Sequence, residues 1–234
     1  MAIILITGGN KGLGYETARR LILQGHKVYI GSRNLERGQR AANDLGATCL
    51  SIDVTNDSSV QAAAKTFEGL ESHLDVLINN AGISGGMITP DELVVETMQK
   101  TFDTNVFGIV RMIHAFMPIL QKSTTPAIVN VSSGLGSFGT VLNPSTVESK
   151  IHFAHYSASK AAVNMLTLQY AKALPEVHVN AVDPGYTATD FNQHSGPQNV
   201  VQGTDAIVRM ATNGIDRQNG QTGTLSNRHG TMPW

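Results

Sequence analysis

Residues 7–14 read Thr-Gly-Gly-Asn-Lys-Gly-Leu-Gly and join an apolar run to an amphipathic stretch. The run, residues 2–7, predicts a buried strand, and the spacing of apolar side chains over 13–25 predicts a helix. Glycines at such a junction let the backbone turn tightly and approach a pyrophosphate at the free N–H groups of the helix. A glycine-rich turn without a ligand remains the alternative for this stretch alone. The predicted phosphate-binding residues are Gly8, Asn10, Lys11, Gly12, Leu13 and Gly14.

The rest of the chain continues the alternation of apolar runs and amphipathic stretches. This alternation predicts an α/β fold, a doubly wound Rossmann-type parallel sheet of about seven strands with helices on both faces. No repeat, charge run or linker interrupts residues 1–234, which are therefore predicted to form a single domain. The predicted strands are 2–7, 27–32, 48–52, 74–78, 127–131, 177–182 and 222–226, and the predicted helices are 13–25, 35–45, 57–70, 91–121 (one or two helices), 155–174 and 203–213.

The composition is that of a globular protein, with 41% apolar and 15% charged residues. A formal net charge of -1 leaves no basic surplus for a phosphate backbone, so nucleic acid is not an expected partner. The first apolar run is too short to span a bilayer, so no membrane partner is expected. Cys49 is the only cysteine, which rules out an intrachain disulfide and favours the cytoplasm as the expected location.

The end of the second predicted strand bears on the choice of nicotinamide cofactor. In dinucleotide-binding folds an acidic residue at this place binds the ribose 2′-hydroxyl of NAD. The sequence here is Gly31-Ser32-Arg33, without an acid. Arg33 is a planar, permanent cation that suits a 2′-phosphate, and Lys11 adds a second positive charge. These features predict NADP(H), the alternative being that both cations are only solvated on their loops.

Tyr156 and Lys160 begin the predicted helix 155–174 and are four positions apart, so they lie on one face of it. A free tyrosine has a pKa near 10, and a nearby ammonium group would lower it. Such a tyrosine can give a proton to a ketone oxygen while a hydride reaches the carbon. Ser133 ends the fifth predicted strand, at the sheet edge where ligands bind, and its hydroxyl can stabilise the substrate oxygen.

The chain resembles the short-chain dehydrogenase/reductase family over its whole length. The motifs that carry the resemblance are the T-G-x-x-x-G-x-G glycine loop, Asn79-Asn80-Ala81-Gly82, Asn105 in Thr104-Asn105-Val106, Ser133, Tyr156 with Lys160, and Pro184-Gly185-Tyr186-Thr187-Ala188-Thr189. The glycine loop and the closing Met232-Pro233-Trp234 are similar to the carbonyl reductase branch, which mostly reduces ketones and aldehydes with NADPH.

The resemblance implies roles for these residues. Tyr156 would be the general acid/base, and Lys160 would bind the nicotinamide ribose and tune Tyr156. Ser133 would position the carbonyl group, with Ser132 as the other candidate, and Asn105 would hold a water in a proton relay. The cofactor would also contact Asp53 and Val54 at the adenine, Asn80, Ala81 and Gly82 along its length, and Pro184, Gly185, Thr187 and Thr189 near the carboxamide.

The separation between Ser133 and Tyr156 is longer than is usual in this family. Residues 134–153 therefore form an insertion that is expected beside the active site. Some carbonyl reductases with a longer insertion here are monomers, which leaves the oligomeric state open among monomer, dimer and tetramer. Residues 190–202 are the predicted substrate lid, and their short length suggests an open, tolerant pocket.

Two other functions are weighed against a carbonyl reductase. A 3-oxoacyl reductase or a steroid-type dehydrogenase would use the same catalytic residues, and only its substrate would differ. A non-catalytic NADP(H) sensor would typically lack the tyrosine or the lysine, and this chain keeps both. His152 and His155 flank the tyrosine, but no carboxylate or cysteine cluster accompanies them, so no metal site is expected.

Overall fold

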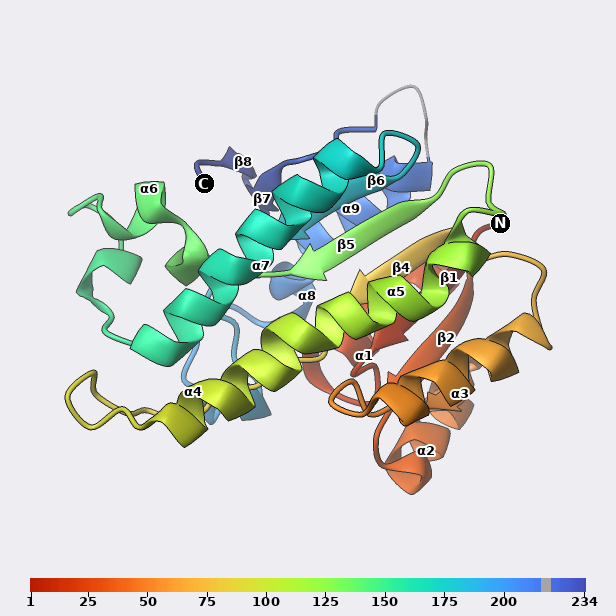
Figure 1. Ribbon diagram of the computed structural model, residues 1–234, viewed down its shortest axis with the longest axis horizontal. Helices are drawn as coiled ribbons and strands as arrows, with labels where there is room; N and C mark the ends of the chain where they lie inside the picture. Colours follow the sequence, from red (N-terminus) through yellow and green to blue (C-terminus); the bar gives the residue numbers. More distant parts are fainter. Residues whose placement is uncertain (216–219) are drawn as a thin grey trace.

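The computed structural model describes residues 1–215 and 220–234. Their strands form one sheet in the order β3-β2-β1-β4-β5-β6-β7-β8 (Figure 1). The strands are β1 (Ile3–Thr7), β2 (Lys27–Ser32), β3 (Thr48–Ser51), β4 (Val76–Asn79), β5 (Ala127–Val131), β6 (His178–Val182), β7 (Leu225–Asn227) and β8 (Gly230–Met232). The chain winds outward from β1 in one direction and from β4 in the other, which confirms the doubly wound Rossmann-type fold.

The far edge of the sheet differs from the predicted set of about seven parallel strands. All neighbours from β3 to β7 pair in parallel, but β8 pairs with β7 in the antiparallel direction. A tight turn joins them, in which the Asn227 side chain accepts a 2.8 Å hydrogen bond from the backbone of His229. Because β8 has only three residues, no alternating pattern reveals it in the sequence.

The helices enclose the sheet from both sides. The α-helices are α1 (Gly12–Leu23), α2 (Leu35–Leu45), α3 (Asp57–Glu68), α4 (Val95–Phe102), α5 (Gly108–Leu120), α6 (Phe138–Val141), α7 (Ala154–Ala173), α8 (Val200–Gly203) and α9 (Asp205–Ile215). The described residues also form shorter helical turns, which are the π-helix η1 (Asp103–Phe107) and the 3-10 helices η2 (Gly134–Gly136), η3 (Glu148–Lys150) and η4 (Asp190–Asn192). Within the described ranges, no helix has the length and apolar character needed to cross a membrane. The cytoplasmic location stays a prediction.

Side chains on the two faces of the central strands enter two separate apolar cores. Ile3 and Leu5 of β1 pack with α3, α5 and α7, whereas Ile4 and Ile6 pack with α1, α2 and α9. Figure 1 shows α5 and α7 crossing the near face of the sheet, with α9 behind it. Burial on both faces explains why these strands are continuous apolar runs in the sequence.

The predicted helical stretch 91–121 consists of two α-helices and begins later than predicted. The first helix begins at Val95, and α4 is joined to α5 by the π-helical turn η1. A π turn inserts an extra residue into the helical ladder and often marks a functional site. Here it contains Asn105, whose side chain is buried.

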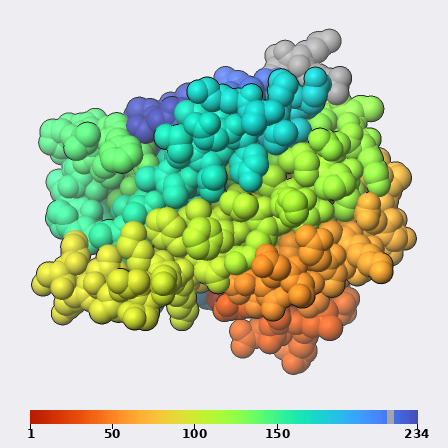
Figure 2. All heavy atoms as spheres, viewed as in Figure 1, coloured from red at the N-terminus to blue at the C-terminus, as the bar shows by residue number. Residues whose placement is uncertain are grey.

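The predicted insertion and the predicted substrate lid both carry short helices. Residues 134–153 contain η2, α6 and η3, and residues 190–202 contain η4 and most of α8. Figure 2 shows the first of these, in green, at the same end of the molecule as the loop around residues 84–94, in yellow. The start of α7 lies between them (Figure 1), so both border the end that holds Tyr156.

Candidate active site

The glycine loop between β1 and α1 is tightly packed at Gly9 and Gly14 and needs a positive φ at two other glycines. Gly8 and Gly12 have φ values of 66° and 55°, which favour glycine. A Cβ atom on Gly14 would lie 2.4 Å from the carbonyl oxygen of Gly8, so the start of α1 packs directly on the loop. Lys11, the residue before the helix, makes no side-chain cap, and the first turn has no acidic residue. The loop therefore offers uncapped N–H groups and a positive helix end, which suit a pyrophosphate.

Residues after β4 hold this loop in place. The side-chain amide of Asn80 donates to the carbonyl oxygens of Thr7 at 2.8 Å and Gly8 at 3.2 Å. The Thr7 hydroxyl accepts from the backbone N–H groups of Asn80 and Ala81, each at 3.0 Å. A Cβ on Gly82 would lie 3.3 Å from Asn105 Oδ1, so the predicted cofactor stretch 80–82 connects the loop to a predicted catalytic residue. In this structure Asn80 supports the loop through its side chain.

The predicted adenosine end lies beyond β2 and β3. Arg33 is exposed directly after β2. Burial raises the pKa of Asp53, but hydrogen bonds from Thr55 and the positive charge of Arg33 outweigh it, so the pKa falls below its usual value. Val54 is buried against Gly108 at the start of α5. The charge of Arg33 thus acts on Asp53, so the predicted 2′-phosphate residue and the predicted adenine residue lie at the same end of the sheet.

Lys11 has a partner that the sequence does not reveal. Its ammonium group lies 3.0 Å from Asp190, and both side chains are well exposed, at 62% and 60%. Asp190 also lies 3.0 Å from His194. An exposed pair of this kind adds little stability, but it connects the glycine loop to η4 of the predicted lid. A role for Lys11 toward a 2′-phosphate stays a prediction.

Tyr156 and Lys160 stand one turn apart at the start of α7, at the carboxyl ends of β5 and β6. The ammonium nitrogen of Lys160 is 5.5 Å from the centroid of the Tyr156 ring. It donates a 2.8 Å hydrogen bond to the carbonyl oxygen of Val131, the last residue of β5. A Cβ on Gly136 would lie only 2.4 Å from the Lys160 backbone, so η2 packs tightly against this turn. The position of the lysine is therefore determined by packing on two sides.

The environment acts on the two groups in opposite directions. Burial lowers the pKa of Lys160 to about 8, against the effect of Asp183, which raises it. Burial and the charge of Asp183 raise the pKa of Tyr156 above its ordinary value, and a hydrogen bond with Ser133 reverses part of that. The expectation that Lys160 lowers the tyrosine pKa is therefore wrong for this structure, because desolvation of the phenolate dominates. These effects favour the protonated form of Tyr156.

The structure distinguishes the two candidate serines. The Ser132 hydroxyl is buried and donates to Asn164 at 2.5 Å and to the Lys160 carbonyl at 3.3 Å. The Ser133 hydroxyl accepts a 3.2 Å bond from Leu135 and is a hydrogen-bond neighbour of Tyr156. Ser133 is thus the serine placed to reach a substrate oxygen, and Ser132 anchors α7 to the sheet.

Asn105 is buried in η1 and bridges two other segments. It exchanges hydrogen bonds with the backbone of Ile83, accepting at 2.8 Å and donating at 2.9 Å, and it also donates to Ser159 at 3.1 Å. Ser159 in turn bonds the carbonyl of Tyr156 at 2.7 Å. Asn105 is thereby connected to the catalytic turn of α7 through one side chain.

The segment after β6 folds over the glycine loop. Thr187 is buried and its hydroxyl bonds the carbonyl oxygen of Pro184 at 3.0 Å. Gly185 has a φ of 69°, and a Cβ there would collide with Gln198. Thr189 caps η4, and its side chain lies 3.8 Å from the position of a Cβ on Gly12. These predicted carboxamide contacts therefore stand beside the predicted phosphate site.

Three residues near the catalytic turn were missed by sequence reasoning. They are Asp183, which follows β6 directly, Glu148 of η3, and Phe191 of η4. A carboxylate at the carboxyl end of an apolar strand is a signal that could have revealed Asp183. Nothing in the local pattern around Glu148 or Phe191 distinguishes them from other loop residues.

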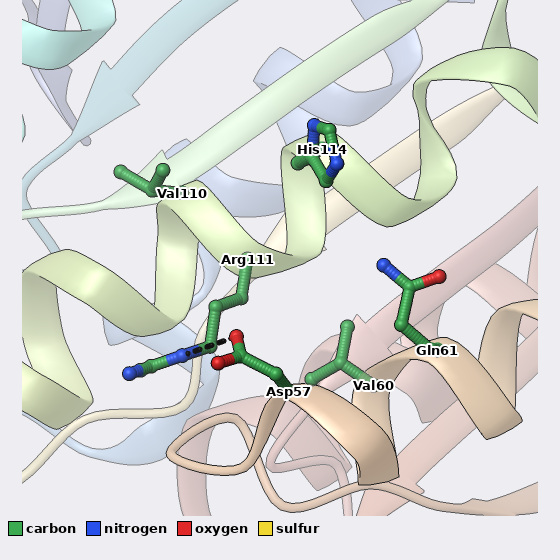
Figure 3. Close-up of a pocket in the computed structure, with 6 residues that line it drawn as sticks. All are labelled: Asp57, Val60, Gln61, Val110, Arg111 and His114. Atoms are coloured by element: carbon green, nitrogen blue, oxygen red, sulfur yellow. Dashed lines mark hydrogen bonds and ion pairs between the residues drawn. The ribbon is translucent and has the colours of Figure 1, made fainter.

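Two other features lie outside the catalytic constellation. His155 is fully buried, and its Nε2 is 3.0 Å from the carbonyl oxygen of Ser84, so it anchors the 84–86 loop. A surface pocket between α3 and α5 (Figure 3) holds an ion pair in which Arg111 lies 2.9 Å from Asp57. The residues that line the pocket are Asp57, Val60, Gln61, Val110, Arg111 and His114. None of them is a predicted site residue.

The comparisons with known proteins agree with this geometry. The family described as short chain dehydrogenase matches residues 2–200. The short-chain dehydrogenase anuI of Penicillium roqueforti is 36% identical over 229 residues, covering 92% of this chain and 90% of that protein. The (+)-neomenthol dehydrogenase of Arabidopsis thaliana is 32% identical, covering 88% of this chain and 90% of that protein.

A solved structure gives the same result for the fold. NADPH-bound carbonyl reductase from chicken fatty liver superposes with a TM-score of 0.86 at 25% identity, covering 100% of this chain and 99% of that chain. The family matched by the sequence consists of oxidoreductases that use nicotinamide cofactors. The chain therefore belongs to the classical short-chain dehydrogenase/reductase family of oxidoreductases.

Proposed function

We propose that this protein reduces a ketone or aldehyde to the alcohol with NADPH, in the manner of a carbonyl reductase. The observation that carries the proposal is the placement of Tyr156 and Lys160 beside Ser133, at the sheet edge that also holds the glycine loop. Arg33 after β2, with no acid at that place, supports NADP(H) over NAD. The NADPH-bound carbonyl reductase structure, similar over the whole chain, supports the same choice.

The chain's own residues bind and orient both reactants. The N–H groups of residues 8–14 would receive the pyrophosphate, and Arg33 the 2′-phosphate. When bound, the reduced nicotinamide supplies the hydride. Lys160, fixed by its hydrogen bond to Val131, would hold the nicotinamide ribose. Thr187 and Thr189, which are both buried, would bind the carboxamide.

Proton transfer falls to Tyr156. Its hydroxyl would donate a proton to the carbonyl oxygen of the substrate, while Ser133 hydrogen-bonds that oxygen and stabilises the developing negative charge. Burial and the charge of Asp183 both favour the protonated form of Tyr156, which is the form that donates this proton. The reductive direction itself is proposed from the cofactor.

The test measures oxidation of NADPH and of NADH with aromatic ketones, isatin-like diketones and ketoesters. Turnover with NADPH that is lost in Tyr156→Phe, but kept in Tyr170→Phe, is the expected result. Tyr170 is a matched control because it lies on the same helix and is partly buried against the apolar core. If the protein turned over only carrier-bound 3-oxoacyl thioesters or only steroids, it would belong to one of those substrate classes instead. Tight NADPH binding without any turnover would contradict the proposed activity.

A further inference from the structure

Asp183 is a buried carboxylate beside the catalytic turn that the mechanism above does not use as a reactant. Its exposed fraction is 6%. It follows Val182 of β6, which is paired with Val131 of β5, the residue whose carbonyl oxygen receives the Lys160 ammonium group. Its position at the carboxyl end of β6 therefore places it next to the lysine's anchor point.

A second carboxylate approaches Asp183 from the insertion 134–153. At Gly134, the position of a Cβ atom is 3.2 Å from Oε1 of Glu148 and 3.4 Å from Oδ2 of Asp183. The two carboxylate oxygens thus converge on one point, from η3 on one side and the end of β6 on the other. Two carboxylates this close together in a partly desolvated site repel each other, so ionising both of them is unfavourable.

The groups around Asp183 act on its charge in opposite directions. Oδ1 accepts a 3.0 Å hydrogen bond from the backbone of Gly185. Burial raises the pKa of Asp183 and Glu148 adds to the rise, whereas the backbone N–H groups of Gly185 and Gly134 and the charge of Lys160 lower it. The rise prevails. The charge of Asp183 also acts on Tyr156, which lies one turn before Lys160 on α7.

We propose that Asp183 is a positioning residue whose charge, controlled by Glu148 of the insertion, sets the proton affinity of Tyr156 and Lys160. The proposal rests on the proposed reductase function. The ionised Asp183 disfavours the phenolate of Tyr156 and favours the ammonium form of Lys160. The insertion thereby has a chemical task in addition to shaping the pocket, since Glu148 determines at which pH Asp183 becomes charged.

The first experiment reads the carboxyl group without using activity. Infrared spectra of the wild type minus Asp183→Asn, recorded over a pH series, follow the protonated carboxyl band of Asp183. We expect a midpoint above the ordinary aspartate value of about 3.9. In Glu148→Gln, with Asp183 intact, that midpoint should fall by about one pH unit, because a neighbouring negative charge is removed. A wild-type midpoint at the ordinary value, or no change in Glu148→Gln, would overturn the proposal.

The second experiment records the pH profile of kcat for NADPH-dependent ketone reduction. Reduction requires protonated Tyr156, and Lys160, whose pKa is about 8, also loses its proton at alkaline pH, so the rate falls on the alkaline side as these two groups titrate. Asp183→Asn removes a negative charge and should move this fall to lower pH by about one unit. Asp75→Asn is the matched control, because Asp75 is also 6% exposed but precedes β4, at the opposite end of the strands. It should leave the profile unchanged.

The two experiments separate the failure of this inference from that of the proposed function. An alkaline limb that stays in place in Asp183→Asn overturns the inference while the reductase activity stands. A wild type without turnover overturns the proposed function. The infrared midpoints then test only whether Glu148 raises the pKa of Asp183. A merely structural role for Asp183 would lower stability or kcat without displacing the profile.

Discussion

The ring of Phe191 meets the ring of Tyr156 edge to face, with centroids 5.7 Å apart and planes at 61°. Phe191 belongs to η4 of the lid and remains 46% exposed. The lid is tied back to the glycine loop by the pair between Asp190 and Lys11. The lid therefore places an apolar ring directly beside the proposed proton donor, where a substrate carbonyl would enter.

Phe191→Ala should weaken substrate binding more than it slows the chemistry. Removing the ring takes away apolar contact area with the substrate, and the KM for an aromatic ketone should rise about tenfold, with kcat changed less. Phe191→Leu, which keeps an apolar side chain, should have an intermediate KM. Steady-state kinetics with one ketone tests this. Equal KM values in all three proteins would show that the ring does not touch the substrate.

Arg33→Ala should remove the preference for NADPH. A charge-assisted bond to a phosphate is worth about 1.5–3 kcal/mol, so the KM for NADPH should rise at least tenfold while that for NADH stays unchanged. Arg37→Ala is the control, since Arg37 is an exposed cation in the first turn of α2. Cofactor titration by fluorescence gives the same comparison without a substrate. A parallel loss for both cofactors would contradict a role at the 2′-phosphate.

Gly136→Ala should destabilise the protein. The new Cβ would lie 2.4 Å from the backbone carbon of Lys160, which forces η2 and α7 apart, and overpacking of this kind costs about 1–3 kcal/mol. Gly69→Ala is the control, because its φ is -74° and its nearest neighbour would be at 3.4 Å. Urea unfolding measures both. Equal stability of the two variants would mean that the turn accommodates a methyl group.

Lys160→Met should stabilise the fold while abolishing activity. A lysine whose pKa falls from 10.5 to about 8 on folding lowers stability by about 3 kcal/mol, less the contribution of the bond to Val131. The sign follows from proton binding: between pH 8 and 10.5 the unfolded chain binds more protons, so wild-type stability rises with pH in this window. The loss of stability from burying the charged Lys160 is complete below pH 8 and disappears as the pH approaches 10.5.

Unfolding free energies at pH 7 and near pH 10 test this sign. The increase in unfolding free energy caused by Lys160→Met should be largest at pH 7 and small near pH 10. Lys65→Met, on the exposed face of α3, should show no such pH dependence. A gain of equal size at both pH values would show that packing, and not the buried charge, is responsible.

The sequence alone determined the features that depend on local patterns. Continuous apolar runs predicted the strands of the parallel sheet because burial on both faces requires them. The glycine loop and the Tyr156–Lys160 pair were predicted because turn geometry and helical spacing are local properties. The short strand β8 and the π turn η1 have no such pattern, so neither could be predicted from local residues.

Tertiary structure decided which distant residues meet. Lys11 and Asp190 are 179 positions apart, and Glu148 reaches Asp183 from a different loop. Phe191 lies on Tyr156 only because the lid folds back over the site. The pKa of Tyr156 rises for the same reason, since desolvation depends on everything packed around the ring. Loops carry no periodicity, so the contacts and the burial that they create follow only from the packed fold.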